Sequence, residues 1–93
     1  MNPTVDPVAA VRSQFLARCR EDVAALQAAM ADPAGKGRKT LLITIHQLSG
    51  AAGVFGFRAI SEMAGELDDA LQAGETPEPA DVQALVDAVK AIL

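Results

Sequence analysis

The stretch Ile45–Gly56, IHQLSGAAGVFG, holds the single histidine of the 93-residue chain, followed by glycines at positions 50, 53 and 56. The apolar residues in and before this stretch recur at intervals of three and four, which predicts an amphipathic helix: Leu41, Ile45, Leu48, Ala52 and Phe55. A glycine inside a helix costs about 0.5–1 kcal/mol relative to alanine. Two such glycines beside one imidazole therefore need a reason in packing or in function.

Three further segments show the same spacing of apolar residues. The first contains Val8, Val11, Phe15, Cys19, Val23, Leu26 and Met30; the third Phe57, Ile60, Ala64, Leu67 and Leu71; and the fourth Val82, Leu85, Val89 and Ile92. We expect helices over roughly 7–31, 38–55, 57–73 and 78–92. Asp6 is a candidate cap for the first helix, with Pro7 at its first position, while Gly56 and Gly74 are candidate terminators.

The connections between these segments are short, so consecutive helices should lie antiparallel, and each apolar stripe needs a partner. The composition agrees with an all-helical fold, because the chain is 51% hydrophobic but only 3% aromatic, whereas strands favour aromatic and β-branched residues. We expect a single domain over residues 1–93, folded as an all-α, up-down-up-down antiparallel four-helix bundle.

Composition also excludes several classes of function. The formal net charge is −4, which argues against nucleic acid or an anionic membrane as a partner, because both require clustered basic surface. One histidine and one distant cysteine cannot complete a metal site, and GKGRKT lacks the Gly-Lys-Ser/Thr order of a nucleotide-binding P-loop. With no signal peptide or membrane span in the pattern, we expect a cytoplasmic monomer.

His46 lies outside the core stripe of its own helix. Helical side chains lean toward the N-terminus, so a side chain at position 50 would cover the turn that carries residue 46. Gly50 removes that cover, and Gly53 clears the next turn. In a hairpin turning at Gly56, residue 46 should face positions 65 to 68, where Asp68 could hold one imidazole N–H and leave the other nitrogen as a nucleophile.

The run His46–Gly56 resembles the signature of histidine-containing phosphotransfer (HPt) domains. The matching positions after the histidine are Leu48, Gly50, Ala51, Ala52, Phe55 and Gly56. One position departs from the family pattern, because HPt domains usually carry a lysine three residues after the histidine, where this chain has Ser49. A serine hydroxyl can donate a hydrogen bond but supplies no charge. Lys39 and Arg58 are candidates to replace the missing cation.

The resemblance implies a phosphorelay intermediate in two-component signalling. His46, through Nε2, would exchange a phosphoryl group with the aspartate of a response-regulator receiver domain, or accept it from a histidine kinase. Supporting residues would be Ser49, Gly50, Gly53 and Asp68, and the partner would dock on Lys39, Leu42, Val54, Phe57 and Arg58. The domain would be no autonomous enzyme, with no nucleotide site and no cofactor, and Mg²⁺ would belong to the receiver.

Two alternatives stay open from the sequence. Because Ser49 stands where a cation is usual, the chain could be an HPt-like adaptor that signals by association without phosphotransfer. It could also be a plain helical domain that dimerises through an apolar stripe. Replacement of His46 should abolish function only if the histidine is the phosphoacceptor.

Overall fold

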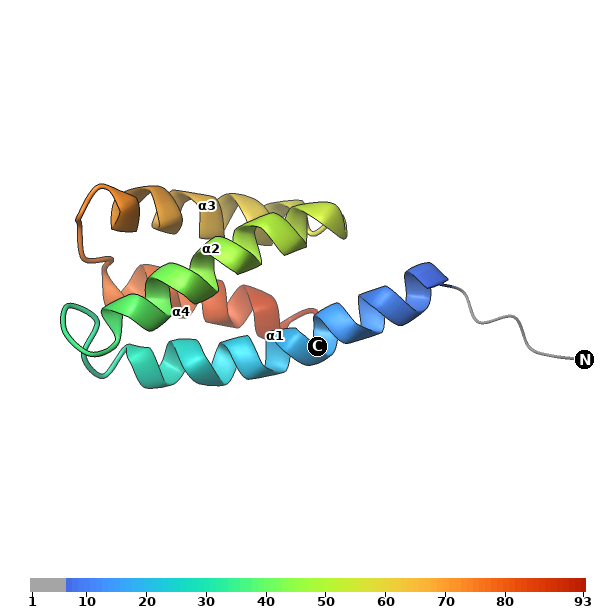
Figure 1. The fold of residues 1–93 in the computed structure, drawn as a ribbon, viewed down its shortest axis with the longest axis horizontal. Coiled ribbons are helices and arrows are strands. Elements are labelled where there is room, and N and C mark those ends of the chain that lie inside the picture. The colour runs from blue at the N-terminus through green and yellow to red at the C-terminus, as the bar shows by residue number, and fades with distance from the viewer. Residues whose placement is uncertain (1–6) are drawn as a thin grey trace, which may run out of the picture.

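The computed structural model describes residues 7–93, which form four helices connected by short loops (Figure 1). These are α1 (Pro7–Ala29), α2 (Arg38–Val54), α3 (Arg58–Gln72) and α4 (Pro79–Lys90). Helix α2 packs against α1 and α3, and α4 packs against the same two helices from the other side. The prediction of an all-α four-helix bundle is confirmed, and the described residues contain no strand. None of the helices in residues 7–93 is both long and apolar enough to cross a membrane.

Helix α1 ends at Ala29, two residues before the expected boundary. The carboxylate of Asp32 accepts hydrogen bonds from the backbone N–H groups of Gly35 (3.2 Å) and Lys36 (3.0 Å). An aspartate that bonds to backbone N–H groups a few residues along stabilises a turn in place of further helix. The chain therefore reverses directly after Asp32 and enters α2 at Arg38. Asp6, the candidate cap of α1, lies outside the described residues.

Two glycines end α2 and α3 in the same way. Gly56 and Gly74 have φ angles of 81° and 87°, a left-handed conformation that side chains disfavour. After α2, Phe57 N–H donates to the Ala52 carbonyl (2.9 Å) and Gly56 N–H to that of Gly53 (3.3 Å). The same pair of bonds follows α3. These are the two bonds of a Schellman motif, which reverses the chain within three residues and sets the register of the α2–α3 hairpin.

The core runs along the inside of all four helices and includes Cys19, Leu26, Leu41, Ile45, Leu48, Leu71, Val82, Leu85, Val86 and Val89. The three phenylalanines close one end of the bundle. Phe15 stacks on Phe55 and on Phe57, with ring centroids 4.9 and 5.7 Å apart, and the Arg12 guanidinium lies 4.9 Å from the Phe57 ring centroid. This cluster joins α1 to the turn of the α2–α3 hairpin.

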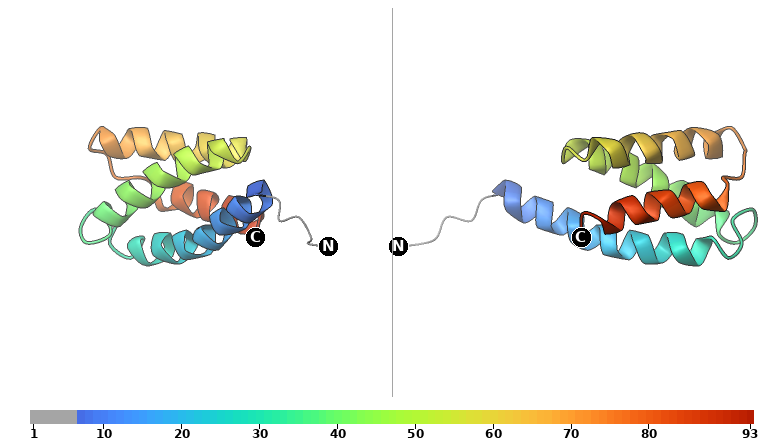
Figure 2. Two further views of the ribbon diagram at one scale, coloured as in Figure 1. Left: turned by 45° about the vertical axis from the view of Figure 1, so that its right-hand side comes forward. Right: turned by 180° about the vertical axis from the view of Figure 1, so that it is seen from behind.

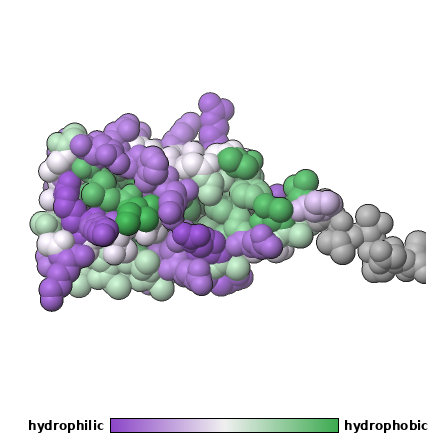
Figure 3. Space-filling model, viewed as in Figure 1, coloured by the Kyte–Doolittle hydropathy of each residue, from purple (hydrophilic) through white to green (hydrophobic). Residues whose placement is uncertain are grey.

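The expectation that Val8 and Val11 belong to the core is wrong, because both side chains are exposed. Helix α1 has 23 residues and α4 only 12, so the first turns of α1 project beyond the bundle (Figure 1 and Figure 2). Apolar surface appears on this projection and at the nearby end of α2 (Figure 3), where Val54 is also exposed. Helical spacing identifies the apolar face of α1 but not where its neighbours end.

Cys19 offers a test of the packing around α1. Its side chain is fully buried, and burial, together with the negative charge of Asp22, raises the pKa of the thiol to about 11. Because the thiolate is the reactive form, iodoacetamide at pH 8 should leave the folded protein unmodified and should add one adduct in guanidinium chloride, as measured by mass spectrometry. Rapid modification of the folded protein would contradict this packing.

Asp22 offers a test of the electrostatics of the same helix. Burial raises the pKa of this carboxyl group, although the Arg18 guanidinium, 3.5 Å away, acts in the opposite direction. The folded protein thus binds this proton more tightly than the unfolded chain, and this group's contribution to stability falls as pH rises from the ordinary aspartate pKa through the raised value. Asp22→Asn should therefore raise the urea midpoint at pH 7 and leave it nearly unchanged near pH 3.

The matched control for this prediction is Asp69→Asn, which removes the same charge from an exposed position on α3. Its urea midpoint should stay close to that of the wild type at both pH values, because exposed charges without a partner contribute little. A lower midpoint for Asp22→Asn at pH 7 would mean that the ion pair with Arg18 outweighs the cost of burying the carboxylate.

Candidate functional site

His46 lies at the middle of α2 on the face turned away from the core. Its neighbours Ile45 and Leu48 are buried, which fixes the rotation of the helix, whereas the His46 side chain is 69% exposed. A residue next to the core stripe on a well-packed helix has a fixed backbone and a side chain open to solvent. An imidazole in this place is accessible to a second protein.

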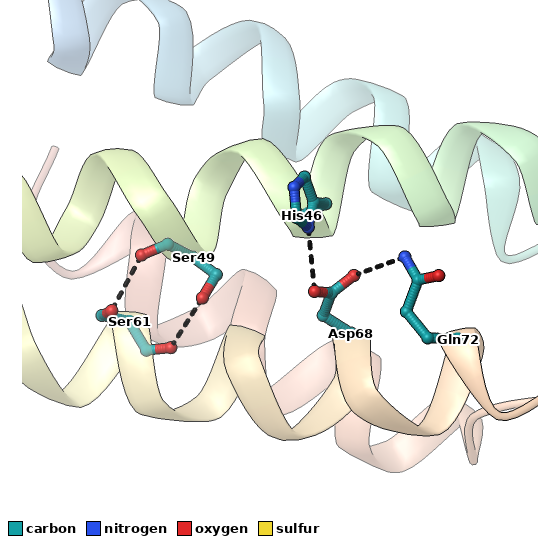
Figure 4. A network of polar contacts seen from close by, with 5 residues as sticks. All are labelled: His46, Ser49, Ser61, Asp68 and Gln72. Atoms are coloured by element: carbon teal, nitrogen blue, oxygen red, sulfur yellow. Dashed lines mark hydrogen bonds and ion pairs between the residues drawn. The ribbon is translucent and has the colours of Figure 1, made fainter.

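Asp68 of α3 holds the imidazole from across the hairpin. Its Oδ2 lies 2.9 Å from His46 Nδ1, and its other oxygen lies 3.4 Å from the amide nitrogen of Gln72, one turn further along α3 (Figure 4). The Asp68 side chain is only 15% exposed. A carboxylate accepts hydrogen bonds, so Nδ1 carries the hydrogen, and in the neutral ring Nε2 keeps its lone pair. Figure 4 shows this second nitrogen pointing away from α3.

Ser49 is turned toward α3 and is bonded there. Its hydroxyl donates to the Ser61 carbonyl (3.3 Å), and the Ser61 hydroxyl donates to the Ser49 carbonyl (2.8 Å), so the two helices are joined by a reciprocal pair of bonds (Figure 4). Both serines are partly buried. The sequence suggested that the Ser49 hydroxyl could assist a phosphoryl group; the structure places it in the contact between the helices.

The glycines around the site occupy two different environments. A Cβ atom at Gly50 would meet nothing within 4 Å, so this position is open surface beside the imidazole. A Cβ at Gly53 would lie 3.2 Å from the Ser61 hydroxyl, and one at Gly65 would lie 3.4 Å from the Ser49 hydroxyl. Gly53 therefore permits the close packing of α2 on α3, and only Gly50 leaves space above the histidine.

The five predicted docking residues are spread widely over the molecule. Leu42 lines a shallow depression together with His46 and Gln72. Lys39 is exposed on the same face of α2, and Val54 is exposed at the end of the helix. Phe57, by contrast, is half-buried in the aromatic stack, and Arg58 is paired with Glu62 (3.1 Å). The structure thus places Leu42 beside His46 and Lys39 two turns away on the same face, and leaves Phe57 and Arg58 at the hairpin turn.

Neither candidate replacement for the missing cation is beside the imidazole. Lys39 precedes His46 by seven residues, about 10 Å along the helix, and its side chain leans further away. Arg58 precedes Asp68 by ten residues, about 15 Å along α3. Arg38 is used elsewhere, because its guanidinium donates to the carbonyls of Leu71 (2.9 Å) and Glu75 (3.0 Å).

Three residues that sequence reasoning missed lie around the histidine, and a fourth contacts one of them. Ile43, Gln47 and Gln72 line the same depression, and Arg18 of α1 donates to the side-chain oxygen of Gln47 (2.7 Å). Gln72 and Ile43 could have been found from their spacing of four from Asp68 and three from His46. Arg18 could not, because its place depends on how α1 packs against α2. No group of three or more metal-binding side chains occurs within residues 7–93.

Comparison with known proteins bears on this arrangement. The family model described as Hpt domain matches residues 10–93, which includes all four helices except the first three residues of α1. Neither the curated proteins nor the solved structures give a match. Members of this family are phosphotransfer carriers in two-component signalling and interact with kinases and response regulators. With a match over nearly the whole chain, four helices and an exposed histidine at the centre of the second, this protein belongs to the histidine-containing phosphotransfer (Hpt) domain family.

Proposed function

We propose that His46 is the phosphoacceptor and that it exchanges a phosphoryl group with the aspartate of a response-regulator receiver domain. The observation that carries this proposal is the hydrogen bond of 2.9 Å between His46 Nδ1 and Asp68, which leaves Nε2 free on an exposed side chain. A histidine fixed through one nitrogen presents a defined tautomer and a defined direction of attack.

The transfer step follows from this geometry. The Nε2 lone pair attacks the phosphorus of the receiver's aspartyl phosphate, the N–P bond forms, and the P–O bond to the aspartyl group breaks. The aspartate leaves with the bonding electrons as a carboxylate. The hydrogen on Nδ1 stays in place, so the phosphorylated ring becomes an imidazolium whose positive charge faces the Asp68 carboxylate. The reverse reaction delivers the phosphoryl group to a second receiver.

In this proposal the domain provides the nucleophile and the side chains that orient it, and the receiver provides the metal and the acidic group. Phosphoryl transfer depends mainly on positioning and on neutralising charge. The receiver supplies the aspartate and Mg²⁺, and the carrier needs neither a nucleotide nor a cofactor. The receiver would dock on the exposed face of α2, where Leu42, Ile43 and Val54 provide apolar surface and Gly50 leaves room for the partner's backbone to approach.

A second candidate function is an adaptor that keeps the fold but transfers no phosphoryl group. It is favoured by one observation, namely that the Ser49 hydroxyl is occupied by the Ser61 carbonyl and offers a phosphoryl group neither charge nor a free donor. Replacement of the histidine distinguishes the two functions, because an adaptor should bind its partner equally well without it.

His46→Gln provides the first test. The purified protein is mixed with a panel of receiver domains charged with radioactive acetyl phosphate, and labelled protein is separated by gel electrophoresis. The wild type should take up label that is lost in acid and retained in alkali, whereas His46→Gln should take up none. Since residue 46 is exposed, the variant should fold normally, which circular dichroism checks. Label on the variant, or none on the wild type with any receiver, would contradict the proposal.

Asp68→Asn tests the orienting carboxylate. The amide oxygen can still accept the hydrogen bond, but the negative charge that faces the imidazolium is lost, so transfer from the receiver should slow by about tenfold, equivalent to about 1.4 kcal/mol in the barrier. Rapid-quench measurement of label on His46 gives the rate. Asp69→Asn is the matched control, with the same change at the next, exposed position. Equal rates for the two variants would exclude a role for Asp68.

A further inference from the structure

A phosphoryl group on His46 needs a positive charge that the known family pattern would place at position 49. The group carries up to two negative charges, and in this chain residue 49 is a serine whose hydroxyl is bonded to α3. Lys39, Arg38 and Arg58 are distant or engaged with other groups. Within the described residues, the positive charge would then have to come from a side chain on a different helix.

Arg18 of α1 reaches the residue next to the histidine. Its guanidinium donates to the side-chain oxygen of Gln47 (2.7 Å), the shortest side-chain hydrogen bond found in residues 7–93. On its other side, its Nε lies 3.5 Å from Asp22, so the planar group is held at two points while its side chain remains 57% exposed. Gln47 and His46 line the same depression. Through its bond to Gln47, the Arg18 guanidinium is therefore connected to one of the residues that line this depression.

The chemistry of the pair suits a phosphoryl group. Guanidinium has five N–H donors in a planar arrangement that matches phosphate oxygens. The contacts with Gln47 and Asp22 leave several of these donors free. Because Gln47 accepts from Arg18 through its oxygen, its amide NH₂ group is also left to donate. Arg18 and Gln47 thus offer one charge and several donors on the side of α2 that faces away from Asp68.

We propose that Arg18, oriented by Gln47 and Asp22, is the phosphoryl-binding cation of this domain and takes the place of the basic residue absent at position 49. The inference rests on the proposed function, because it concerns the group carried by His46. It assigns the neutralising charge to α1, a helix that carries no part of the signature sequence.

The test uses phosphoramidate, a small N–P donor that phosphorylates accessible imidazole without a partner protein. The ³¹P resonance of phosphorylated His46 is followed against pH in the wild type, in Arg18→Ala and in Arg20→Ala. A guanidinium close to the phosphoryl group favours its dianion, so Arg18→Ala should move the midpoint of this titration upward by about 0.5 pH unit. Arg20→Ala removes the same charge from an exposed position on the far side of α1 and should leave the midpoint unchanged.

Further variants separate this role from a structural one. Arg18→Ala leaves the Asp22 carboxylate without its partner, so the change is repeated in an Asp22→Asn background. Gln47→Met keeps the Arg18–Asp22 pair and should also move the titration midpoint upward. Arg18→Lys retains a positive charge, so its midpoint should lie close to that of the wild type.

Two outcomes would overturn the inference in distinguishable ways. Equal midpoints in the wild type, Arg18→Ala and Arg20→Ala would show that Arg18 does not contact the phosphoryl group, while His46 remains the phosphoacceptor. Folded wild-type protein that takes no phosphoryl group from phosphoramidate or from any receiver would overturn the proposed function, and this inference with it.

Discussion

The close approach of α2 and α3 is the constraint on which the site depends. Helices normally pack with axes 8–10 Å apart, at a distance set by the side chains between them. Here Ser49 and Ser61 bond to each other's backbone, and Gly53 and Gly65 add no side chain at the same interface. A short aspartate can then reach across to His46 at 2.9 Å. A side chain at position 53 would press on the Ser61 hydroxyl, and one at position 65 would touch the Ser49 hydroxyl, so larger residues there would act directly on the contact between the two helices.

The two members of this contact differ in their access to water. The His46 side chain is 69% exposed, as a group must be if a second protein is to reach it, whereas the Asp68 side chain is 15% exposed. A hydrogen bond is stronger where water is excluded, so the orienting carboxylate acts from the sheltered side and the nucleophilic nitrogen stays on the open side. The fold thereby meets two requirements of a phosphoryl carrier: the orientation of the imidazole is fixed, and its reactive nitrogen stays accessible.

The sequence was sufficient for the four helices, because each apolar stripe has helical spacing and Gly56 and Gly74 mark where chain reversal occurs. It also paired His46 with Asp68, since a tight hairpin leaves little freedom in the register of its two helices. It failed at Val8 and Val11, whose exposure depends on where α4 ends. The hydrogen bonding of Ser49 was missed as well, because a hydroxyl on the border between two faces can turn either way.

The contacts of Arg18 show why the missing charge could not be found by reading along α2. Neighbours on one helix are separated by three or four residues, and this spacing is visible in any sequence. Arg18 and Gln47 are 29 residues apart and meet only because α1 packs against α2. The His46 ring is thus oriented by α3 and, in the proposed arrangement, the charge of its phosphoryl group is neutralised by α1. Substitutions in α1 can then alter the charge beside the phosphoryl group while the α2–α3 contact that aims the ring stays intact.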